Sequence, residues 1–413
     1  MRVLVVGSGA REHALAWKLA QSSALTELHA APGNPGIAHV AECHPVLADD
    51  AEGILALVSS IAADLVVVGP EAPLVAGLAD LLRRFGVPVF GPSAKAAAIE
   101  GSKSLAKEVM AAAGVPTAEL LEEARAPCVL KADGLAGGKG VHVCRTQSEV
   151  EVALESLQVL GRDLVVEELL EGVEVSLFAL CDGRTALPLV PAQDFKRAFD
   201  GDEGPNTGGM GSYAPLPWLG REEAERLASS IHVPVLAELE RRDALFVGLL
   251  YAGLMLTDDG PRVLEFNCRF GDPETQSVVP LLDGDFLEAL AAAAVGDLGG
   301  VHVEAVPGAA VTVVLAARDY PAAADRGTPI SGISDCEATG ALVFHAGTAV
   351  QGERLVTNGG RVLGVTGLGA TVADARAAAY DGAARIECRA LRSRSDIALA
   401  AASTTSYGGA EGA

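Results

Sequence analysis

The sequence predicts a multidomain α/β protein, and three observations support this fold class. Apolar runs of four or five residues recur at 2–6, 65–68 and 87–90. Such runs, separated by turns and helical patterns, are typical of a buried parallel sheet. Half of the residues are hydrophobic and only 4% are aromatic, which suits aliphatic strands packed under small-residue helices. The length of 413 residues predicts about two to four domains.

The charge and the cysteines exclude several classes of protein. With 31 Lys and Arg residues against 54 Asp and Glu residues, the net charge is −23, which argues against binding to a nucleic-acid backbone. No run approaches the roughly 18 apolar residues of a membrane span, and the first residues become polar too early for a signal peptide. The seven cysteines include no CxxC pair. We therefore expect a cytoplasmic protein with free thiols and without membrane or nucleic-acid partners.

The first hundred residues contain the predicted parallel sheet. Its strands and helices are expected, in chain order, at 2–6, 11–20, 28–30, 65–68, 70–84 and 87–90. Ligands bind at the carboxyl ends of such strands, where three turns lie: Gly7–Glu12, Ala31–Asn34 and Gly69–Pro73. The first turn lacks the third glycine of a dinucleotide fingerprint, because position 12 is Glu, and this disfavours a dehydrogenase. We expect an anion-binding turn at a helix N-terminus, with a plain tight turn as the alternative.

A glycine-rich loop after a strand at 128–131 is a candidate phosphate site. It runs to Gly140 and contains four glycines, with Lys131 and Lys139 near its two ends. Glycines let backbone amides approach phosphate oxygens, and lysines supply positive charge. The loop is not a Walker A motif, because no Ser or Thr follows the second lysine. A surface hairpin with solvated lysines is the alternative.

Two further segments carry candidate binding groups. The strand at 164–167 runs into several carboxylates up to residue 174. Such a segment can offer backbone groups to adenine and a Glu to ribose, although a solvated acidic loop is the alternative. Farther along, Lys196 and Arg197 precede the glycine-rich loop 204–211. Its amides and hydroxyls, together with these two cations, suit an anionic substrate, and an ordinary loop is the alternative.

A row of polar side chains on one strand is a candidate metal site. Glu265 and Asn267 share a face because strand side chains alternate. Two hard oxygen ligands suit Mg²⁺, which keeps waters and nucleotide phosphates as its other ligands. Arg269 follows on the same face and can stabilise a transferring phosphoryl group. An unliganded row on an exposed strand is the alternative.

The last part of the chain predicts a mixed α+β domain. We expect strands at 310–316, 341–345 and 361–366, one helix at 372–390, and a flexible tail at 398–413. The eight histidines have no metal-ligand spacing. We therefore assign no catalytic role to His13 or His345, and we expect His345 within a strand of this domain.

Taken together, these segments resemble the ATP-grasp enzymes and, more narrowly, the glycinamide ribonucleotide synthetase (phosphoribosylamine–glycine ligase) family. The resemblance covers nearly the whole chain and depends on the order of the motifs, since any one of them alone is weak. The motifs are, in chain order, GSGAREHALAW, APGNPG, VVGPEAPLVAG, FGPS, EGSK, KADGLAGGKGV, VVEELLEGVEVS, QDFKR, GPNTGGMGSY, GLLYAGLM, LEFNCRFGDPETQ, FHAGT and TNGGRVL.

The resemblance implies both an architecture and a reaction. It implies an N-terminal parallel α/β (pre-ATP-grasp) substrate-binding domain at 1–101, and an ATP-grasp domain at 102–325 with a small lid at about 117–175. A C-terminal domain with a flexible tail would occupy 326–413. The implied reaction joins glycine to 5-phosphoribosylamine through a glycyl phosphate, with ATP as cosubstrate and Mg²⁺ or Mn²⁺ as cofactor. A monomer is implied.

The resemblance also implies roles for individual residues. Catalytic roles would belong to Lys131, Asp194 and Arg269. ATP would contact Lys103, Lys131, Gly134, Gly138, Lys139, Gly140, Glu167, Glu168, Leu169 and Glu174. The other substrates would contact Gly9, Arg11, Glu12, Asn34, Glu71, Asp194, Lys196, Asn206, Gly208, Gly209 and Arg269. The metal would be held by Glu265 and Asn267.

Two alternatives to this function stay open, and one electrostatic expectation follows from it. The first alternative is another ATP-grasp carboxylate–amine ligase, against which the two substrate loops argue. The second is a nucleotide-binding module without catalysis, which would lack the metal pair or the phosphate lysines. Because the substrates are anions and the chain is acidic, we expect the cations of the motifs to gather in one cleft. These cations are Arg11, Lys103, Lys131, Lys139, Lys196, Arg197 and Arg269.

Overall fold

The N-terminal part of the chain forms the expected parallel sheet. The computed structural model describes residues 1–135, 140–158, 161 and 163–403. The first strand is buried from Val3 to Gly7, as expected for a strand covered on both faces. All neighbouring strands run parallel. Their spatial order is β3 (Glu42–Cys43), β2 (Glu27–Pro32), β1 (Arg2–Gly7), β4 (Leu65–Val68) and β5 (Val89–Phe90).

The helices of this region differ from the expected ones at one glycine. The single helix expected at 70–84 is two helices, because Gly77 adopts a φ of 91° between them. This left-handed conformation is accessible to glycine and ends a helix. The helical segments of the region are α1 (Ala10–Leu19), η1 (Ile37–His39), α2 (Ala51–Ile61), α3 (Glu71–Val75), α4 (Leu78–Arg84) and α5 (Ala94–Gly101).

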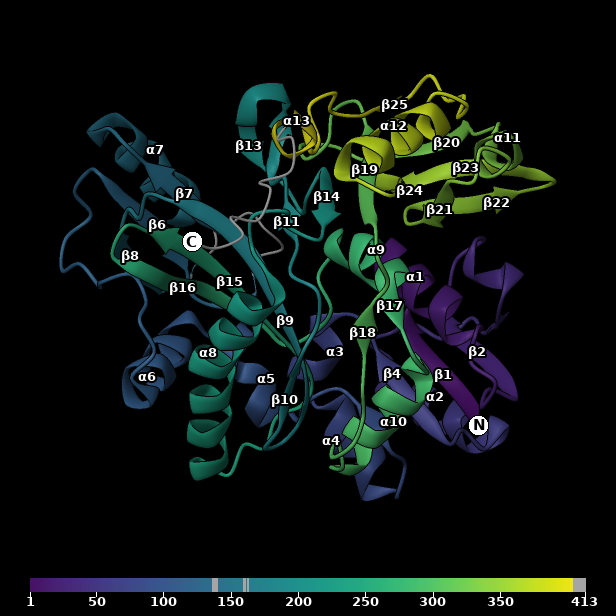
Figure 1. Cartoon of the computed structure of the whole chain (residues 1–413), viewed down its shortest axis with the longest axis horizontal. Helices are drawn as coiled ribbons and strands as arrows, with labels where there is room; N and C mark the ends of the chain where they lie inside the picture. The colour runs from purple at the N-terminus through teal and green to yellow at the C-terminus, as the bar shows by residue number, and fades with distance from the viewer. Residues whose placement is uncertain (136–139, 159–160, 162, 404–413) are drawn as a thin grey trace, which may run out of the picture.

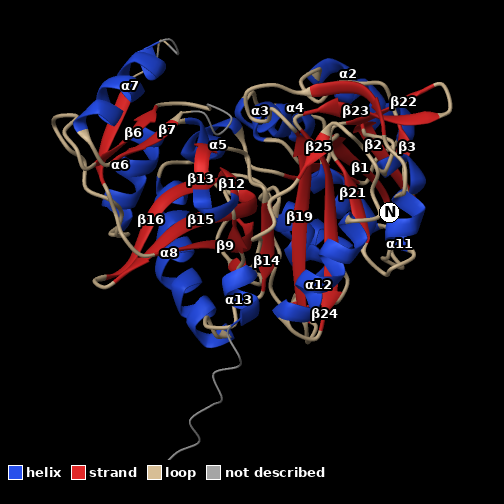
Figure 2. Ribbon diagram, turned by 90° about the horizontal axis from the view of Figure 1, so that it is seen from above, coloured by secondary structure: helices blue, strands red, loops and turns tan. Residues whose placement is uncertain are grey.

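The central region contains two antiparallel sheets. One has the order β10 (Ala186–Pro188), β9 (Val173–Asp182), β15 (Val247–Thr257) and β16 (Gly260–Asn267). The other, within the expected lid, has the order β7 (Val141–Cys144), β6 (Cys128–Ala132) and β8 (Leu164–Glu168). The long helix α8 packs against β9 and β10, and Figure 2 shows it beside β9. The helical segments of this region are α6 (Lys103–Ala113), α7 (Gln147–Gln158), η2 (Asp200–Asp202), α8 (Arg221–Arg241), α9 (Glu274–Val278), η3 (Val279–Leu281) and α10 (Phe286–Val295).

The C-terminal part is built on two antiparallel sheets. The larger sheet has the order β11 (Gln193–Asp194), β14 (Gly211–Ala214), β19 (Ala309–Ala317), β24 (Arg361–Gly369) and β21 (Leu342–His345), with β25 (Leu391–Arg392) beside β19. The smaller sheet has the order β20 (Asp325–Pro329), β23 (Arg354–Gly359) and β22 (Thr348–Gln351). The larger sheet crosses the domain division expected at 325/326, and the three-domain division stays a prediction. Short paired strands complete the fold: β12 (Arg197–Phe199), β13 (Glu203–Asn206), β17 (Leu282–Asp283) and β18 (Glu304–Ala305).

Two expectations for the C-terminal region are wrong. The helix expected at 372–390 ends earlier, as α12 (Val372–Ala383). The tail expected from residue 398 begins with a short helix, α13 (Leu399–Ser403), and residues 404–413 lie outside the described part of the chain. The one other described helix of this region is α11 (Ile333–Glu337).

The three regions meet around the first helix and the end of the first strand. Helix α1 packs against β21 and α9 (Figure 1), and Trp17 contacts Phe344 edge-on at 6.0 Å between ring centroids. Helix α10 packs against both β5 and β9. Segments from the whole length of the chain therefore surround one region. Within the described residues, no helix has the length and apolarity needed to cross a membrane.

Candidate active site

The turn after β1 is braced by Glu12. Its Oε2 accepts the Gly9 N–H at 2.6 Å, and its Oε1 accepts the Arg11 Nε–H at 2.6 Å. Both charged side chains are buried. A Cβ atom at position 9 would lie 2.7 Å from Glu12 Oε2, so the backbone must approach the carboxylate closely here. The Glu that replaces the third glycine of a dinucleotide motif therefore shapes the turn.

Asn34 joins this turn to the C-terminal region. Its Nδ2 donates to the Ser8 carbonyl at 2.9 Å and to the His345 carbonyl at 2.7 Å. Its Oδ1 accepts the N–H groups of Gly36 and Ile37, each at 2.9 Å. Both the oxygen and the nitrogen of the Asn34 amide thus bond to backbone groups. Asn34 therefore stabilises the conformation of the loop beside the first turn.

Arg269 connects the N-terminal turns to the strand that carries the candidate metal ligands. Its Nε lies 3.3 Å from Glu71 Oε2, and its Nη2 lies 3.1 Å from Glu100 Oε1 and 3.2 Å from Asn267 Oδ1. Arg11 Nη1 approaches the same Glu71 carboxylate at 4.0 Å. Burial opposes the charge of Arg269, but Glu100 and Glu71 outweigh it and raise its pKa. Two predicted cations and one predicted metal ligand therefore share one network.

Lys131 lies in a buried ion network with Glu167. Lys131 Nζ is 2.7 Å from Glu167 Oε2 and 2.8 Å from the Leu264 carbonyl. The other carboxylate oxygen, Oε1, is 2.9 Å from Lys107 Nζ. Burial lowers the pKa of Lys107 despite this partner. The Glu167 carboxylate, expected near the nucleotide, is thus occupied by two lysines.

Asp133 fixes the entrance of the glycine-rich loop. Its Oδ1 accepts the N–H groups of Lys103 at 2.6 Å and Gly134 at 2.9 Å, and its Oδ2 accepts the Ser104 hydroxyl at 2.7 Å. Burial would raise the pKa of Asp133, but these hydrogen bonds lower it. Lys103 Nζ donates to the Gly134 carbonyl at 3.0 Å. The start of α6 and the start of the loop are therefore held together.

The other described residues of the expected ATP site are spread along the lid sheet, because Gly140 lies beside Ala132 whereas Glu168 lies at the opposite end of β6, beside Cys128. The Gly140 carbonyl accepts the Ala132 N–H at 2.8 Å. Glu168 Oε1 accepts the Glu119 N–H at 2.9 Å, and Leu169 follows β8 in the connection to β9. Residues 136–139 of the loop, which include the expected ATP contacts Gly138 and Lys139, lie outside the described residues.

Asp194, Lys196 and Glu174 form a second charged group. Lys196 Nζ pairs with Glu174 Oε1 and lies 3.5 Å from Asp194 Oδ1. Burial raises the pKa of Asp194 in spite of Lys196, and Glu274 and Glu174 raise it further. Burial alone would lower the pKa of Lys196, but Asp194 and Glu174 raise it well above the ordinary lysine value. A carboxyl that holds its proton more readily than usual therefore lies beside a firmly charged lysine.

Glu265 lies where these groups converge. Burial would raise the pKa of its carboxyl, but Lys196, Lys131, Lys103 and Arg269 lower it below the ordinary value. Four of the seven cations expected in one cleft thus act on one carboxylate, and Arg11 joins them through Glu71. Arg197 instead donates to the Gly204 carbonyl at 2.8 Å within its own hairpin. Lys103, Lys131, Lys196 and Arg269 thus lie around Glu265, and the single cleft expected for all seven cations stays a prediction.

The C-terminal region reaches the loop after β13. The Gly208 N–H donates to the Tyr320 hydroxyl at 2.9 Å, and Arg361 Nη1 donates to the Gly208 carbonyl. Arg361 Nη2 also pairs with Asp272 Oδ2 at 2.9 Å. Asn206 Nδ2 is 3.4 Å from the carbonyl of Val141 in the lid.

A pocket of about 310 Å³ opens beside this loop. It is lined by Asn206, Thr207, Gly208, Tyr320, Pro321, Ala322, Ala323, Ala324 and Gly360. Gly209 has a φ of 105°, and a Cβ atom there would lie 2.3 Å from Pro273 Cδ, so only glycine fits this contact. The candidate substrate loop thus packs between the segment that follows β16, at Pro273, and the C-terminal region.

Sequence reasoning missed several of the charged partners. Glu100 lies in the EGSK motif, Asp272 in the GDPETQ segment, and Arg361 in TNGGRVL, so the motifs contained them without assigning a role. Asp133 likewise lies in KADGLAGGKGV without an assigned role. Lys107 lies outside the motifs, and its importance comes from the side chains that the fold places against it.

Comparison with known proteins agrees with this arrangement. Three family models of phosphoribosylglycinamide synthetase match: the N domain over residues 1–100, the ATP-grasp (A) domain over 101–275, and the C domain over 310–400. A phosphoribosylamine–glycine ligase from Streptomyces coelicolor is 51% identical over 97% of this chain and 100% of its own length.

Solved structures give the same relationship. The crystal structure of phosphoribosylamine–glycine ligase from Thermotoga maritima has a TM-score of 0.84 and 36% identity, covering 96% of this chain and 100% of that one. The biotin carboxylase domain of 2-oxoglutarate carboxylase from Hydrogenobacter thermophilus shares the fold, with a TM-score of 0.69 and 20% identity over 95% of this chain and 91% of that one. The chain therefore belongs to the phosphoribosylglycinamide synthetase (phosphoribosylamine–glycine ligase) family.

Proposed function

We propose that the chain catalyses the ATP-dependent ligation of glycine to 5-phosphoribosylamine, giving glycinamide ribonucleotide, ADP and phosphate in purine biosynthesis. One observation carries this proposal: two cations flank the strand that carries Glu265 and Asn267, with Lys131 Nζ 2.8 Å from the Leu264 carbonyl and Arg269 Nη2 3.2 Å from Asn267 Oδ1. Such a cluster suits phosphoryl transfer, in which charge spreads over the oxygens of the transferred group.

The reaction has two steps. In the first, an oxygen of the glycine carboxylate attacks the γ-phosphorus of ATP, and ADP leaves. In the second, the amine of phosphoribosylamine attacks the acyl carbon of glycyl phosphate, forming the amide bond as phosphate leaves and the nitrogen loses a proton. Neither step needs a covalent bond to the protein. Catalysis then comes from positioning and from preorganised charges.

The residues expected to meet ATP and a divalent cation have suitable chemistry. We assign Lys103 and Lys131 to the phosphates of ATP. Glu265 and Asn267 would hold Mg²⁺ or Mn²⁺, since an ionised carboxylate and an amide oxygen are ligands that such hard cations prefer. The lowered pKa of Glu265 keeps its carboxylate charged. When bound, the cation would offset negative charge on the phosphates.

The remaining substrates would lie between the first turn and the loop after β13. Arg269 would stabilise the transferring phosphoryl group, and Asp194 would exchange a proton with the amine, consistent with its raised pKa. Contacts to glycine and phosphoribosylamine are assigned to Gly9, Arg11, Glu12, Glu71, Lys196, Asn206, Gly208 and Gly209. Asn34 would act by holding the loop beside Gly9 in place.

We further propose that the enzyme works as a cytoplasmic monomer without nucleic-acid or membrane partners. All seven cysteines are free thiols in the structure, which suits a reducing compartment.

Phosphate release from ATP tests the proposed reaction. We expect release only when glycine and phosphoribosylamine are both present, with glycinamide ribonucleotide formed in equal amount. Release without either substrate, or with another amine in place of phosphoribosylamine, would instead favour a different ATP-grasp ligase. Nucleotide binding without release under any of these conditions would favour a module without catalysis.

A further inference from the structure

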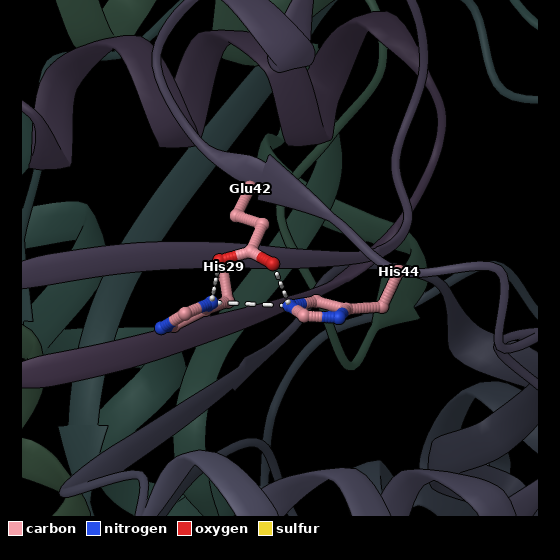
Figure 3. Close-up of side chains that lie close together, drawn as sticks. All are labelled: His29, Glu42 and His44. Carbon is pink, nitrogen blue, oxygen red and sulfur yellow. Dashed lines mark hydrogen bonds and ion pairs between the residues drawn. The ribbon is translucent and has the colours of Figure 1, made fainter.

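A second group of ligand-type side chains lies outside the proposed active-site residues. His29 of β2 and Glu42 of β3 are direct partners across two parallel strands, and His44 follows Glu42 by two positions, which brings it to the same face. Figure 3 shows the three side chains pointing at one another. His29 Nδ1 lies 3.1 Å from His44 Nε2 and 3.7 Å from Glu42 Oε2, and His44 Nε2 lies 4.0 Å from Glu42 Oε1.

These distances match those between the ligands of a single metal ion. With Zn–N bonds of about 2.0–2.1 Å, two ligand atoms of a tetrahedral zinc ion are about 3.3–3.4 Å apart. The three observed separations, 3.1 to 4.0 Å, bracket that value. Among the described residues, this is the one group of at least three such side chains whose ligand atoms approach so closely.

The second nitrogen of His29 supports the same interpretation. His29 is only 5% exposed, and its Nε2 is buried without a hydrogen-bond partner. The nearest carboxylate oxygen is Glu27 Oε2, at 3.5 Å. When a metal takes one ring nitrogen of a histidine, the other carries the proton and is commonly oriented by a carboxylate. Glu27 is placed for that role.

We propose that His29, Glu42 and His44 form a binding site for a divalent transition-metal ion, with Zn²⁺ as the best match. Two imidazoles and one carboxylate are typical zinc ligands, and they leave a fourth position for water. This ligand set differs from the oxygen-only pair Glu265 and Asn267, which suits Mg²⁺. The bound ion would fasten the two-residue edge strand β3 to β2, and so stabilise the connection that carries Asn34.

Zinc binding by the full chain tests the proposal. Protein stripped with a chelator is dialysed against ZnCl₂ in excess Mg²⁺, and bound zinc is measured by atomic absorption. We expect one equivalent in the wild type, and loss of it in His44→Ala. Because Glu42 is 69% exposed, Glu42→Gln will fold, and we expect its zinc affinity to fall by at least about tenfold. Zinc should also raise the Tm of the wild type but not that of His44→Ala.

Two controls separate this site from others. His302→Ala removes an exposed histidine outside the cluster and should keep the bound zinc. Glu265→Gln should keep it too, because the proposed site does not use the active-site carboxylate. The proposal is overturned if the wild type binds no zinc, if His44→Ala binds as much as the wild type, or if Glu265→Gln loses the equivalent while His44→Ala retains it.

Discussion

Replacing Glu167 by Gln tests whether the buried ion network holds the ATP-grasp region together. The carboxylate of Glu167 is the shared partner of Lys107 and Lys131, at 2.9 and 2.7 Å. The amide of Gln keeps the size of the side chain and removes its charge. Both ammonium groups would then lie close together without a carboxylate between them.

The expected cost follows from burial. The three side chains are 3%, 7% and 8% exposed, so solvent screens them little. Breaking a buried ion pair by removing one partner costs about 3–5 kcal/mol. A Gln oxygen still accepts one hydrogen bond, and Lys107 keeps its bonds to the Thr117 hydroxyl and the Ala118 carbonyl. We therefore expect a loss near the lower end, about 3 kcal/mol.

The assay is urea unfolding followed by circular dichroism, with Glu168→Gln as the matched control. Glu168 is the next residue and accepts a single backbone N–H, from Glu119, so its loss should stay below about 1.5 kcal/mol. We also expect Glu167→Gln to lower kcat/KM for ATP, because Lys131 loses its anchor, while Glu168→Gln changes it less.

A double variant makes the reasoning refutable. In Glu167→Gln/Lys107→Met, one of the two opposed lysines is gone, so the combined loss should be smaller than the sum of the single losses by about 0.5–3 kcal/mol. Additive losses, or equal losses for Glu167→Gln and Glu168→Gln, would show that the network does not have the importance assigned to it.

Three further predictions concern other parts of the chain. Glu265→Ala should reduce phosphate release by more than about 100-fold while its circular dichroism spectrum stays unchanged; ordinary turnover at ordinary Mg²⁺ would remove the metal assignment. Burial, with His345 and His39, lowers the pKa of His13 to about 3, so its contribution to stability is present above about pH 6.5 and is lost as pH falls towards 3. The unfolding free energy should therefore fall more steeply below pH 6.5 in the wild type than in His13→Gln, by about 1.4 kcal/mol per pH unit, and equal slopes would contradict this. Arg394 is 1% exposed and pairs with Asp202 in the β12–β13 hairpin, so Arg394→Met should expose residues 197–206 to proteolysis, and an unchanged cleavage pattern would count against that link.

The sequence predicts the elements of this fold better than their ends. Short apolar runs between turns suffice for the parallel sheet, because buried strands need only local hydrophobicity. The end of α12 is different. The alanine-rich pattern continues past Ala383, yet the chain leaves the helix so that Glu387 can pair with Ser331 through two backbone hydrogen bonds of 3.0 and 3.1 Å. A distant segment thus overrides the local helix propensity.

The candidate site, too, could be predicted from the sequence only in part. Spacing alone places Glu265 and Asn267 on one face, since both lie on one strand. It does not reveal that Lys107 lies against Glu167, or that Glu100 lies against Arg269, because those partners are 60 and 169 residues apart in the chain. Pairing between distant charges depends on how the sheets pack, and the periodic spacing of residues along the sequence does not predict it.

The cations of the site have a further property that the net charge of −23 did not suggest. Lys131, Lys196 and Arg269 are each paired with a carboxylate. Buried cations without such partners would repel one another and destabilise the folded protein before any substrate arrives. Anionic substrates therefore meet cations that already have carboxylate partners, and binding must add phosphate or glycine oxygens to these ion pairs. Selectivity then depends on which ligand meets these ion pairs with the better geometry, more than on the positive potential of an open cleft.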